Sequence, residues 1–132
     1  MAPRRSLFAA LGIAAAVYAL PAPAAEVLIV VQRSPLAGFR HYDGQEVWQE
    51  MRVGDRLELV RESDNPYDAG AIRVAWRGRK LGYVPRRDNA AVARQMDRGA
   101  GLEARITELK ESRNRRVRLE FEVVAPLPVT GH

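Results

Sequence analysis

The sequence predicts a mainly β protein: a small antiparallel β-barrel of about six strands with one or two short helices. Apolar residues alternate with polar ones in several short runs, most regularly over Val117–Val123, as in half-buried strands. Turn-forming pairs such as Arg77-Gly78 separate these runs. The stretch from about Asn89 to Arg98 carries an apolar stripe at helical spacing. A small barrel buries one face of every strand and leaves few open edges, so it accommodates this pattern best.

The composition fits one small soluble domain and excludes several kinds of site. Of the 132 residues, 47% are hydrophobic and 28% are charged. The chain has no cysteine, which excludes disulfides and thiolate metal sites, and only His41 and His132 offer an imidazole. Because a structural zinc site needs four closely spaced ligands, we predict no metal and no cofactor. The formal net charge of +5 favours an anionic partner.

The first 25 residues have the pattern of a secretory signal peptide. Arg4 and Arg5 precede the alanine-rich apolar segment Leu7–Leu20, and Ala22–Ala25 offers small residues for cleavage. The apolar segment is short for a membrane span, and an uncleaved anchor helix is the alternative. We expect a periplasmic or secreted bacterial protein with no membrane contact after cleavage. The expected domain then spans residues 26–125, followed by a disordered tail at residues 126–132.

The first half of the expected domain contains two strands and an ambiguous region. Val27–Gln32 is a continuous β-branched run and predicts a buried first strand. Residues 33–43 contain several turn-formers and predict a loop. Residues 45–53 fit neither the helical nor the strand period. Arg56–Arg61 alternates leucines with charged residues, which predicts a half-buried strand.

The second half is predicted to contain a hairpin, a helix and two longer strands. Ala71–Trp76 and Leu81–Val84 pair across the Arg77-Gly78 turn. Asp88 is the expected N-cap of the helix. Leu102–Leu109 and the alternating run described above are the last two strands, joined by a charged turn.

The most informative stretch is the connection between two predicted strands, Asp64–Asp68. Asp64 and Asn65 favour Asx turns, while Pro66 removes a backbone donor and keeps the residue before it extended. Tyr67 and Asp68 then lie on a constrained corner that presents an aromatic ring beside a carboxylate. A simple turn needs the Asn-Pro pair but neither of these two side chains. We therefore interpret the corner as the candidate functional region.

Sequence motifs of catalysis are missing from the chain. It has no serine nucleophile elbow, no His-Glu-x-x-His helix, no phosphate-binding P-loop and no cysteine nucleophile. The acidic pair Asp64 and Asp68 has a simpler role in stabilising the turn. We predict that the protein is not an enzyme.

Three blocks of the sequence resemble the HIRAN domain family. The middle block, Leu59–Ile72, contains the corner and is the most specific of the three. Gly38–Tyr42 resembles the first block and Leu81–Arg86 resembles the block after the corner, and the order and spacing agree. The similarity covers roughly residues 27–124 and suggests a stand-alone bacterial member. It implies a β-barrel similar in size to an OB-fold. The ATP-hydrolysing motor joined to this domain in eukaryotic relatives has no counterpart here.

The resemblance also implies a pocket that takes the 3′ end of single-stranded DNA. In that pocket Tyr67 would be the main stacking platform, and Asp68 would accept hydrogen bonds from the terminal sugar hydroxyl. Arg40 and Arg86 would contact phosphate, and His41 would border a base. Guanidinium groups bind phosphate oxygens bidentately, and stacking a base contributes about 1–3 kcal/mol. The implied nucleic-acid-binding residues are Arg40, His41, Asn65, Tyr67, Asp68, Tyr83 and Arg86.

Three functional hypotheses follow. The first is a binder of single-stranded nucleic-acid ends that acts on extracellular or incoming DNA. The second is a periplasmic binding or interaction module whose pocket takes another anionic or sugar-bearing ligand. The third and weakest is an enzyme. Each implied residue also has a purely structural interpretation, in which Tyr67 packs over the hairpin, Asp68 caps the turn and Tyr83 belongs to the core. We expect a monomer in every case.

Overall fold

The structure is a computed structural model that describes residues 27–113 and 117–127, and it confirms the mainly β class. In these described ranges, two short α-helices and three 3-10 turns accompany six strands. The strands are β1 (Leu28–Pro35), β2 (Arg56–Arg61), β3 (Ile72–Trp76), β4 (Arg79–Tyr83), β5 (Glu103–Glu111) and β6 (Val117–Pro126). The helices are α2 (Gly44–Val47) and α3 (Ala90–Asp97), and the 3-10 turns are η1 (Phe39–His41), η2 (Trp48–Glu50) and η3 (Arg86–Asp88).

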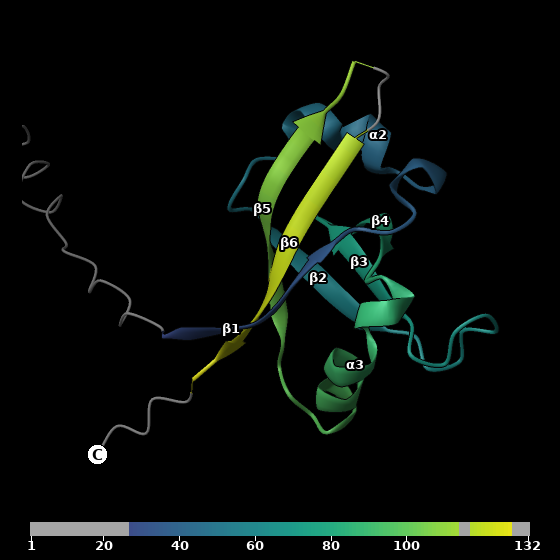
Figure 1. Cartoon of the computed structure of the whole chain (residues 1–132), viewed down its shortest axis with the longest axis vertical. Helices are drawn as coiled ribbons and strands as arrows, with labels where there is room; N and C mark the ends of the chain where they lie inside the picture. Colours follow the sequence, from purple (N-terminus) through teal and green to yellow (C-terminus); the bar gives the residue numbers. More distant parts are fainter. Residues whose placement is uncertain (1–26, 114–116, 128–132) are drawn as a thin grey trace, which may run out of the picture.

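All six strands form one antiparallel sheet in the order β1-β6-β5-β2-β3-β4. The sheet curls on itself, as Figure 1 shows. Its two ends meet where Ala37, just after β1, pairs with Tyr83 of β4. Each residue donates its N–H to the carbonyl oxygen of the other over 2.9 Å. The result is the expected OB-like barrel, in which a single bridge joins the two ends of an otherwise open sheet.

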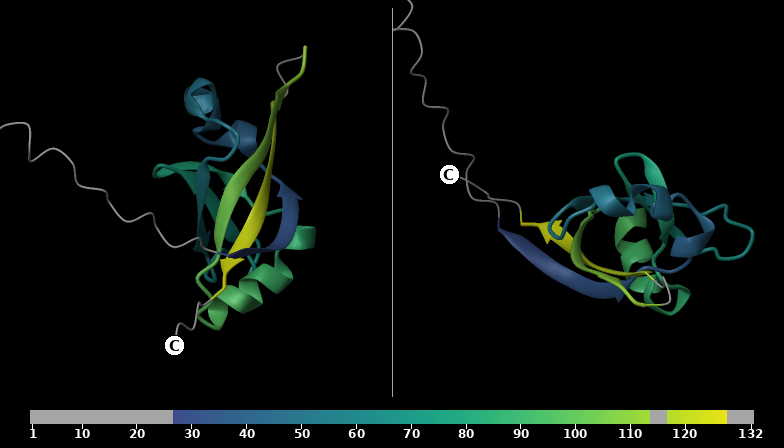
Figure 2. Two further views of the ribbon diagram at one scale, coloured as in Figure 1. Left: turned by 90° about the vertical axis from the view of Figure 1, so that its left-hand side faces the viewer. Right: turned by 90° about the horizontal axis from the view of Figure 1, so that it is seen from above.

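The core lies inside the curled sheet, because the inward positions of its strands are apolar. Leu57 of β2, Ile72 of β3 and Phe121 of β6 are fully buried there. Helix α3 covers one end of the barrel and buries Val92, while α2 lies at the other end (Figures 1 and 2). The hydrophobic effect thus accounts for the closed shape, since each strand removes one apolar face from water.

The prediction of a buried first strand was wrong in one respect. β1 is a strand, but Ile29 and Val30 are exposed, and burial begins only near Ser34. The reason is that Leu28–Val30 pairs with the end of β6 and leaves the body of the barrel, so little of the chain covers its faces. A β-branched run reports strand propensity, and it does not show whether the strand lies against the core.

The start of α3 also differs from the prediction. Asn89, and not Asp88, occupies the capping position, and its side chain makes no capping hydrogen bond. Gly99, with φ of +90°, follows the helix in the left-handed conformation that ends many helices. The expected loop at residues 33–43 begins later, because β1 continues to Pro35.

Several expectations fall outside the described residues. These are the leader at residues 1–25, the middle of the β5–β6 turn at residues 114–116 and most of the expected tail, residues 128–132. The first part of that tail, Pro126, is the last residue of β6. Within the described ranges, no helix has the length and apolarity needed to cross a membrane.

Candidate functional site

The corner between β2 and β3 is held by the side chain of Asn65. Its Oδ1 accepts the backbone N–H of Tyr67 over 2.9 Å and that of Asp68 over 3.2 Å. Its Nδ2 donates to Glu62 Oε1 over 3.1 Å. These bonds close an Asx-type turn without a regular ladder. As a result Tyr67 projects into solvent, with 84% of its surface exposed.

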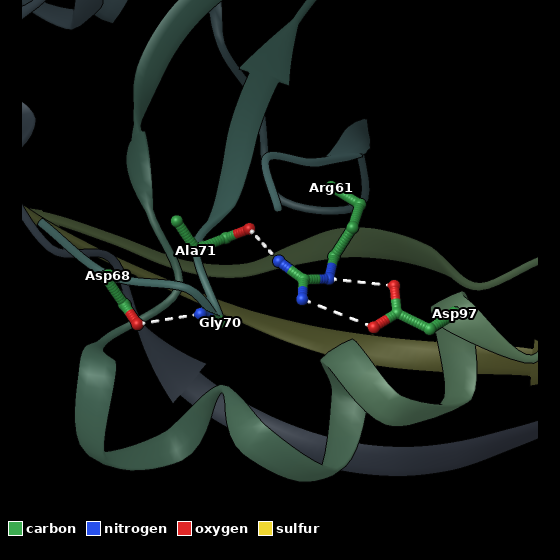
Figure 3. Close-up of polar contacts among 5 residues, drawn as sticks. All are labelled: Arg61, Asp68, Gly70, Ala71 and Asp97. Atoms are coloured by element: carbon green, nitrogen blue, oxygen red, sulfur yellow. Dashed lines mark hydrogen bonds and ion pairs between the residues drawn. The ribbon is translucent and has the colours of Figure 1, made fainter. Parts of the chain in front are cut away.

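Asp68 is oriented by donors on both of its carboxylate oxygens. Gly70 N–H donates to Oδ1 over 2.9 Å, as Figure 3 shows, and Asn89 Nδ2 donates to Oδ2 over 2.7 Å. Asn89 is itself only 4% exposed, so this amide is part of the interior. The carboxylate is therefore fixed in direction, while each oxygen keeps a further lone pair for a ligand.

Arg61 holds the two ends of the β2–β3 connection in place through hydrogen bonds. Its Nη1 donates to the carbonyl oxygen of Ala71 over 3.1 Å. Its Nε and Nη2 donate to the two carboxylate oxygens of Asp97 over 3.0 and 3.3 Å, a bidentate pair (Figure 3). One guanidinium thus ties the end of β2 to the start of β3 and to the last residue of α3, which fixes the frame that carries the corner.

A second polar network lies on β4 and faces the corner. Lys80 Nζ donates to Tyr83 Oη over 2.8 Å, and Tyr83 Oη donates to Glu62 Oε1 over 2.9 Å. The same ammonium group lies 4.1 Å from the ring centre of Tyr42 and 4.7 Å from that of Tyr83. The two rings meet edge to face with centres 5.9 Å apart. Lys80 is therefore a positioned cation, held by one hydroxyl and two aromatic faces.

Lys80 and Tyr83 can meet because β4 contains a bulge. Val74 pairs with Gly82 and Ala75 with Lys80, which leaves Leu81 as an extra residue in β4. In a regular strand, residues three apart point to opposite faces. The extra residue shifts this alternation and brings the two side chains to the same side of the sheet.

The two charged groups of this network have shifted pKa values. Burial alone would raise the pKa of Glu62, but hydrogen bonds from Asn65 and Tyr83, with the nearby positive charges, lower it below its ordinary value. Burial would lower the pKa of Lys80, but its bond to Tyr83 and the charge of Glu62 raise it above the ordinary value. Both groups are therefore charged near neutral pH.

The corner and the β4 network enclose a hollow of about 520 Å³. It combines two cations, Lys80 and Arg86, with three tyrosines and a single carboxylate, Asp68. A second hollow beside the β5–β6 hairpin, of about 730 Å³, has no aromatic residue among its described lining. The first hollow is lined by Ala37, Tyr42, Asn65, Pro66, Tyr67, Asp68, Ala71, Lys80, Tyr83, Val84 and Arg86. We call it the corner pocket.

Five of the seven residues implied by the family resemblance line the corner pocket. They are Asn65, Tyr67, Asp68, Tyr83 and Arg86. Arg40 and His41 do not line it: both are exposed on η1, and the His41 ring lies edge-on to Tyr42 with centres 6.4 Å apart. The His41 ring thus lies beside Tyr42, which belongs to the pocket lining.

Sequence reasoning missed Lys80 and Asn89 and gave Tyr42 no role. Arg79 and Lys80 precede the predicted strand Leu81–Val84 and were assigned no role, and a period-two pattern does not reveal the β4 bulge. Asn89 gave no signal in the sequence, because asparagine is mostly exposed and a position at the start of a helix is not expected to be buried. Its hydrogen bond to Asp68 joins residues 21 apart in the sequence, so no local pattern could predict it.

Comparisons with known proteins agree with this fold. The HIRAN domain family matches residues 29–127. The fold is similar to a crystal structure of a protein from Lactobacillus plantarum, at 29% sequence identity and a TM-score of 0.65, covering 76% of this chain and 99% of that chain. It is also similar to the HIRAN domain of human HLTF, at 24% identity and a TM-score of 0.60, covering 76% and 78%. No curated protein matches the chain.

Proposed function

Since the chain belongs to the HIRAN domain family, whose members include nucleic-acid-binding modules, we propose that its corner pocket binds the 3′ end of single-stranded DNA. One observation carries the proposal: an exposed aromatic ring, two cations and an oriented carboxylate surround one hollow. Residues that stack on a base, neutralise phosphate and accept a hydrogen bond from a hydroxyl suit a nucleotide terminus. The family is one of binding modules, and we propose no catalytic step.

The division of roles follows from the chemistry of each group. Tyr67 offers its face to a terminal base, a contact that contributes about 1–3 kcal/mol in comparable sites. Lys80 and Arg86 would neutralise the phosphates on the 5′ side of the terminal nucleotide. Asp68 would accept a hydrogen bond from the terminal sugar hydroxyl and would repel a phosphate at that position. The pocket should therefore prefer a free 3′-hydroxyl end.

Arg40 and His41 extend the proposal beyond the pocket. Both lie on η1, beside Tyr42 in sequence, where a strand leaving the pocket would pass. We assign Arg40 to a phosphate outside the terminal nucleotide and His41 to the border of the neighbouring base. Their removal should weaken binding less than removal of Arg86.

The test is fluorescence anisotropy with labelled single-stranded DNA that ends in either a 3′-hydroxyl or a 3′-phosphate, at low and moderate salt. Tighter binding of the hydroxyl end, loss of affinity in Arg86→Ala and Tyr67→Ala, and a smaller salt dependence in Lys80→Met would support the proposal. Arg105→Ala serves as the control, because this exposed arginine lies on β5 outside the pocket lining. Equal binding of both ends, or unchanged affinity in the pocket variants, would refute it.

A second candidate function is favoured by the N-terminal segment. If residues 1–25 direct export, as their pattern suggests, the pocket would meet envelope compounds more often than chromosomal DNA. The same cations and tyrosines would suit a sugar phosphate. Thermal stabilisation by sugar phosphates without any binding of DNA would favour this alternative. Mass spectrometry of the protein from a periplasmic fraction would test the export that it assumes.

A further inference from the structure

The first half of β1 forms an isolated ribbon with the end of β6. Leu28–Val30 pairs with Val124–Pro126, and Figures 1 and 2 show this ribbon leaving the body of the barrel. The partner of β6 on its other side, β5, reaches only as far as Glu103, which pairs with Val124. Two-stranded ribbons are at best marginally stable in water, because neither face is covered.

Several apolar side chains on or beside this ribbon are exposed, although Val124 is buried. Val27 is 55% exposed, Ile29 46% and Val30 44%, and Leu127 on the β6 side is exposed as well. The stretch Val27–Val31 contains no charged residue, no proline and no glycine. Natural edge strands usually carry a lysine, a proline or a bulge that prevents pairing with another chain. The bulge in β1 comes only after Val30, so Leu28–Val30 has no such protection.

The register shows which backbone groups of the ribbon are free. Leu127 N–H donates to the carbonyl oxygen of Val27 over 2.9 Å. Hydrogen-bonded and non-hydrogen-bonded pairs alternate in an antiparallel ladder, so Ile29 bonds to β6 while Leu28 and Val30 do not. Pro126, which has no N–H, lies opposite Leu28 and fits this assignment. The N–H and C=O groups of Leu28 and Val30 therefore point to the open edge.

We propose that this edge pairs with a second copy of the chain, antiparallel and about a two-fold axis at Ile29. In that register Leu28 lies opposite Val30 of the partner subunit, and both present outward backbone groups, so they form hydrogen-bonded pairs. The contact is isologous and closes at two copies. It turns two marginal ribbons into one four-stranded sheet, pairs the open backbone groups and brings the exposed apolar side chains of the two copies beside one another.

The edge suits a second copy for two reasons. Like charges that face each other across the axis would oppose self-pairing, and the uncharged edge brings none together. Its outward backbone groups are also self-complementary: when two copies run antiparallel, the N–H and C=O groups of Leu28 in each copy lie opposite those of Val30 in the other. In Figure 1 the ribbon leaves the barrel on the side away from the β2–β3 loop, so both corner pockets would stay open. A dimer then replaces the monomer expected from the sequence.

The test is sedimentation of the purified full chain over about 1–200 µM, the range in which a small interface of this kind dissociates. The N-terminus is first determined by mass spectrometry. We expect a concentration-dependent dimer that Val30→Pro weakens at least about tenfold. Proline here removes only an outward N–H and leaves the β1–β6 ladder intact. Val53→Lys, which removes an exposed apolar side chain elsewhere, should dimerise like the parent.

Hydrogen exchange keeps the proposal falsifiable if the proline variant folds poorly. The amides of Leu28 and Val30 should exchange more slowly as the parent concentration rises, whereas the Ile29 amide, bonded to β6, should not respond. A parent that is monomeric throughout the range would overturn the proposal. So would a Val30→Pro dimer of parental strength. Slow exchange of the Leu28 and Val30 amides at every concentration would mean that another segment of the same chain, such as residues 1–26, pairs with this edge. That result would also overturn the proposal.

Discussion

Asn89 donates a 2.7 Å hydrogen bond from its side-chain amide to Asp68, and thereby joins the start of α3 to the corner of the pocket. An asparagine in the capping position usually bonds to the helix backbone, and here no such bond is made. Helix α3 therefore lacks the stabilisation of a capping hydrogen bond, and the Asp68 carboxylate is held in a fixed direction instead. Gly70 completes the contact: a Cβ at this position would lie 2.9 Å from Asn89 Oδ1.

Replacing Asn89 by aspartate should disturb the pocket more than the barrel. Asn89→Asp has nearly the same shape but places a second carboxylate against Asp68 in place of a donor. We expect about 1–3 kcal/mol of lost stability, the range for a buried partner left unsatisfied, and loss of the preference for a 3′-hydroxyl end. Chemical denaturation and anisotropy measure the two effects. Unchanged end preference in a folded variant would show that Asn89 has no role in orienting Asp68.

The hydroxyl of Tyr83 should matter more than that of Tyr42. Tyr83→Phe removes the group that links Lys80 to Glu62, and we expect a loss of about 1–2 kcal/mol in unfolding free energy with weaker ligand binding. Tyr42→Phe keeps the ring that faces the Lys80 ammonium and should stay close to the parent. Urea denaturation of both variants makes the comparison. Equal losses would contradict the proposed role of the hydroxyl.

Glu62 should make stability depend on pH in the acid range. Its pKa in the folded protein lies below the ordinary value of 4.5. Its stabilising contribution is therefore complete above pH 4.5 and disappears as the pH falls through the lower, folded value. We expect Glu62→Gln to be less stable than the parent at pH 7, with a difference that narrows below about pH 4.5. Denaturation of both proteins between pH 3 and 7 measures it, and a difference independent of pH would refute the assignment.

Gly82 should tolerate no side chain. A Cβ there would lie 2.2 Å from the carbonyl oxygen of Ala37, the acceptor in the bridge that joins the ends of the sheet. Gly82→Ala should cost about 1–3 kcal/mol or more, as overpacking does in close-packed interiors. Gly101→Ala, with nothing within 4 Å of its Cβ, is the matched control. Thermal denaturation compares the two, and similar melting temperatures would be inconsistent with the bridge as described.

The order of elements was predictable because local patterns determine it. The period-two runs and the Arg77-Gly78 turn placed the last five strands within a few residues of their observed bounds, and the stripe of Val92 and Ala93 identified α3. Burial of β1 was not predictable in the same way. Which strands become neighbours, and whether the rest of the barrel covers them, depends on contacts between residues far apart in the chain.

The candidate site was predictable where its residues are adjacent in sequence. Asn65, Tyr67 and Asp68 form one turn, and its chemistry follows from the residue types. Lys80 and Asn89 entered the site through tertiary features: a one-residue bulge in β4 and a hydrogen bond from the start of α3 to the corner. No periodicity in the chain reports either feature.

The single bridge between Ala37 and Tyr83 has a thermodynamic consequence for any ligand of the corner pocket. Both residues line that pocket, so an occupant rests on the two sides of the join. Occupancy and closure are then linked equilibria. At 100 times its dissociation constant, a ligand adds about 2.7 kcal/mol to the closed state. The Ala37 and Tyr83 amides should therefore exchange more slowly when the pocket is occupied. Their exchange rates can report the binding of any compound without a label.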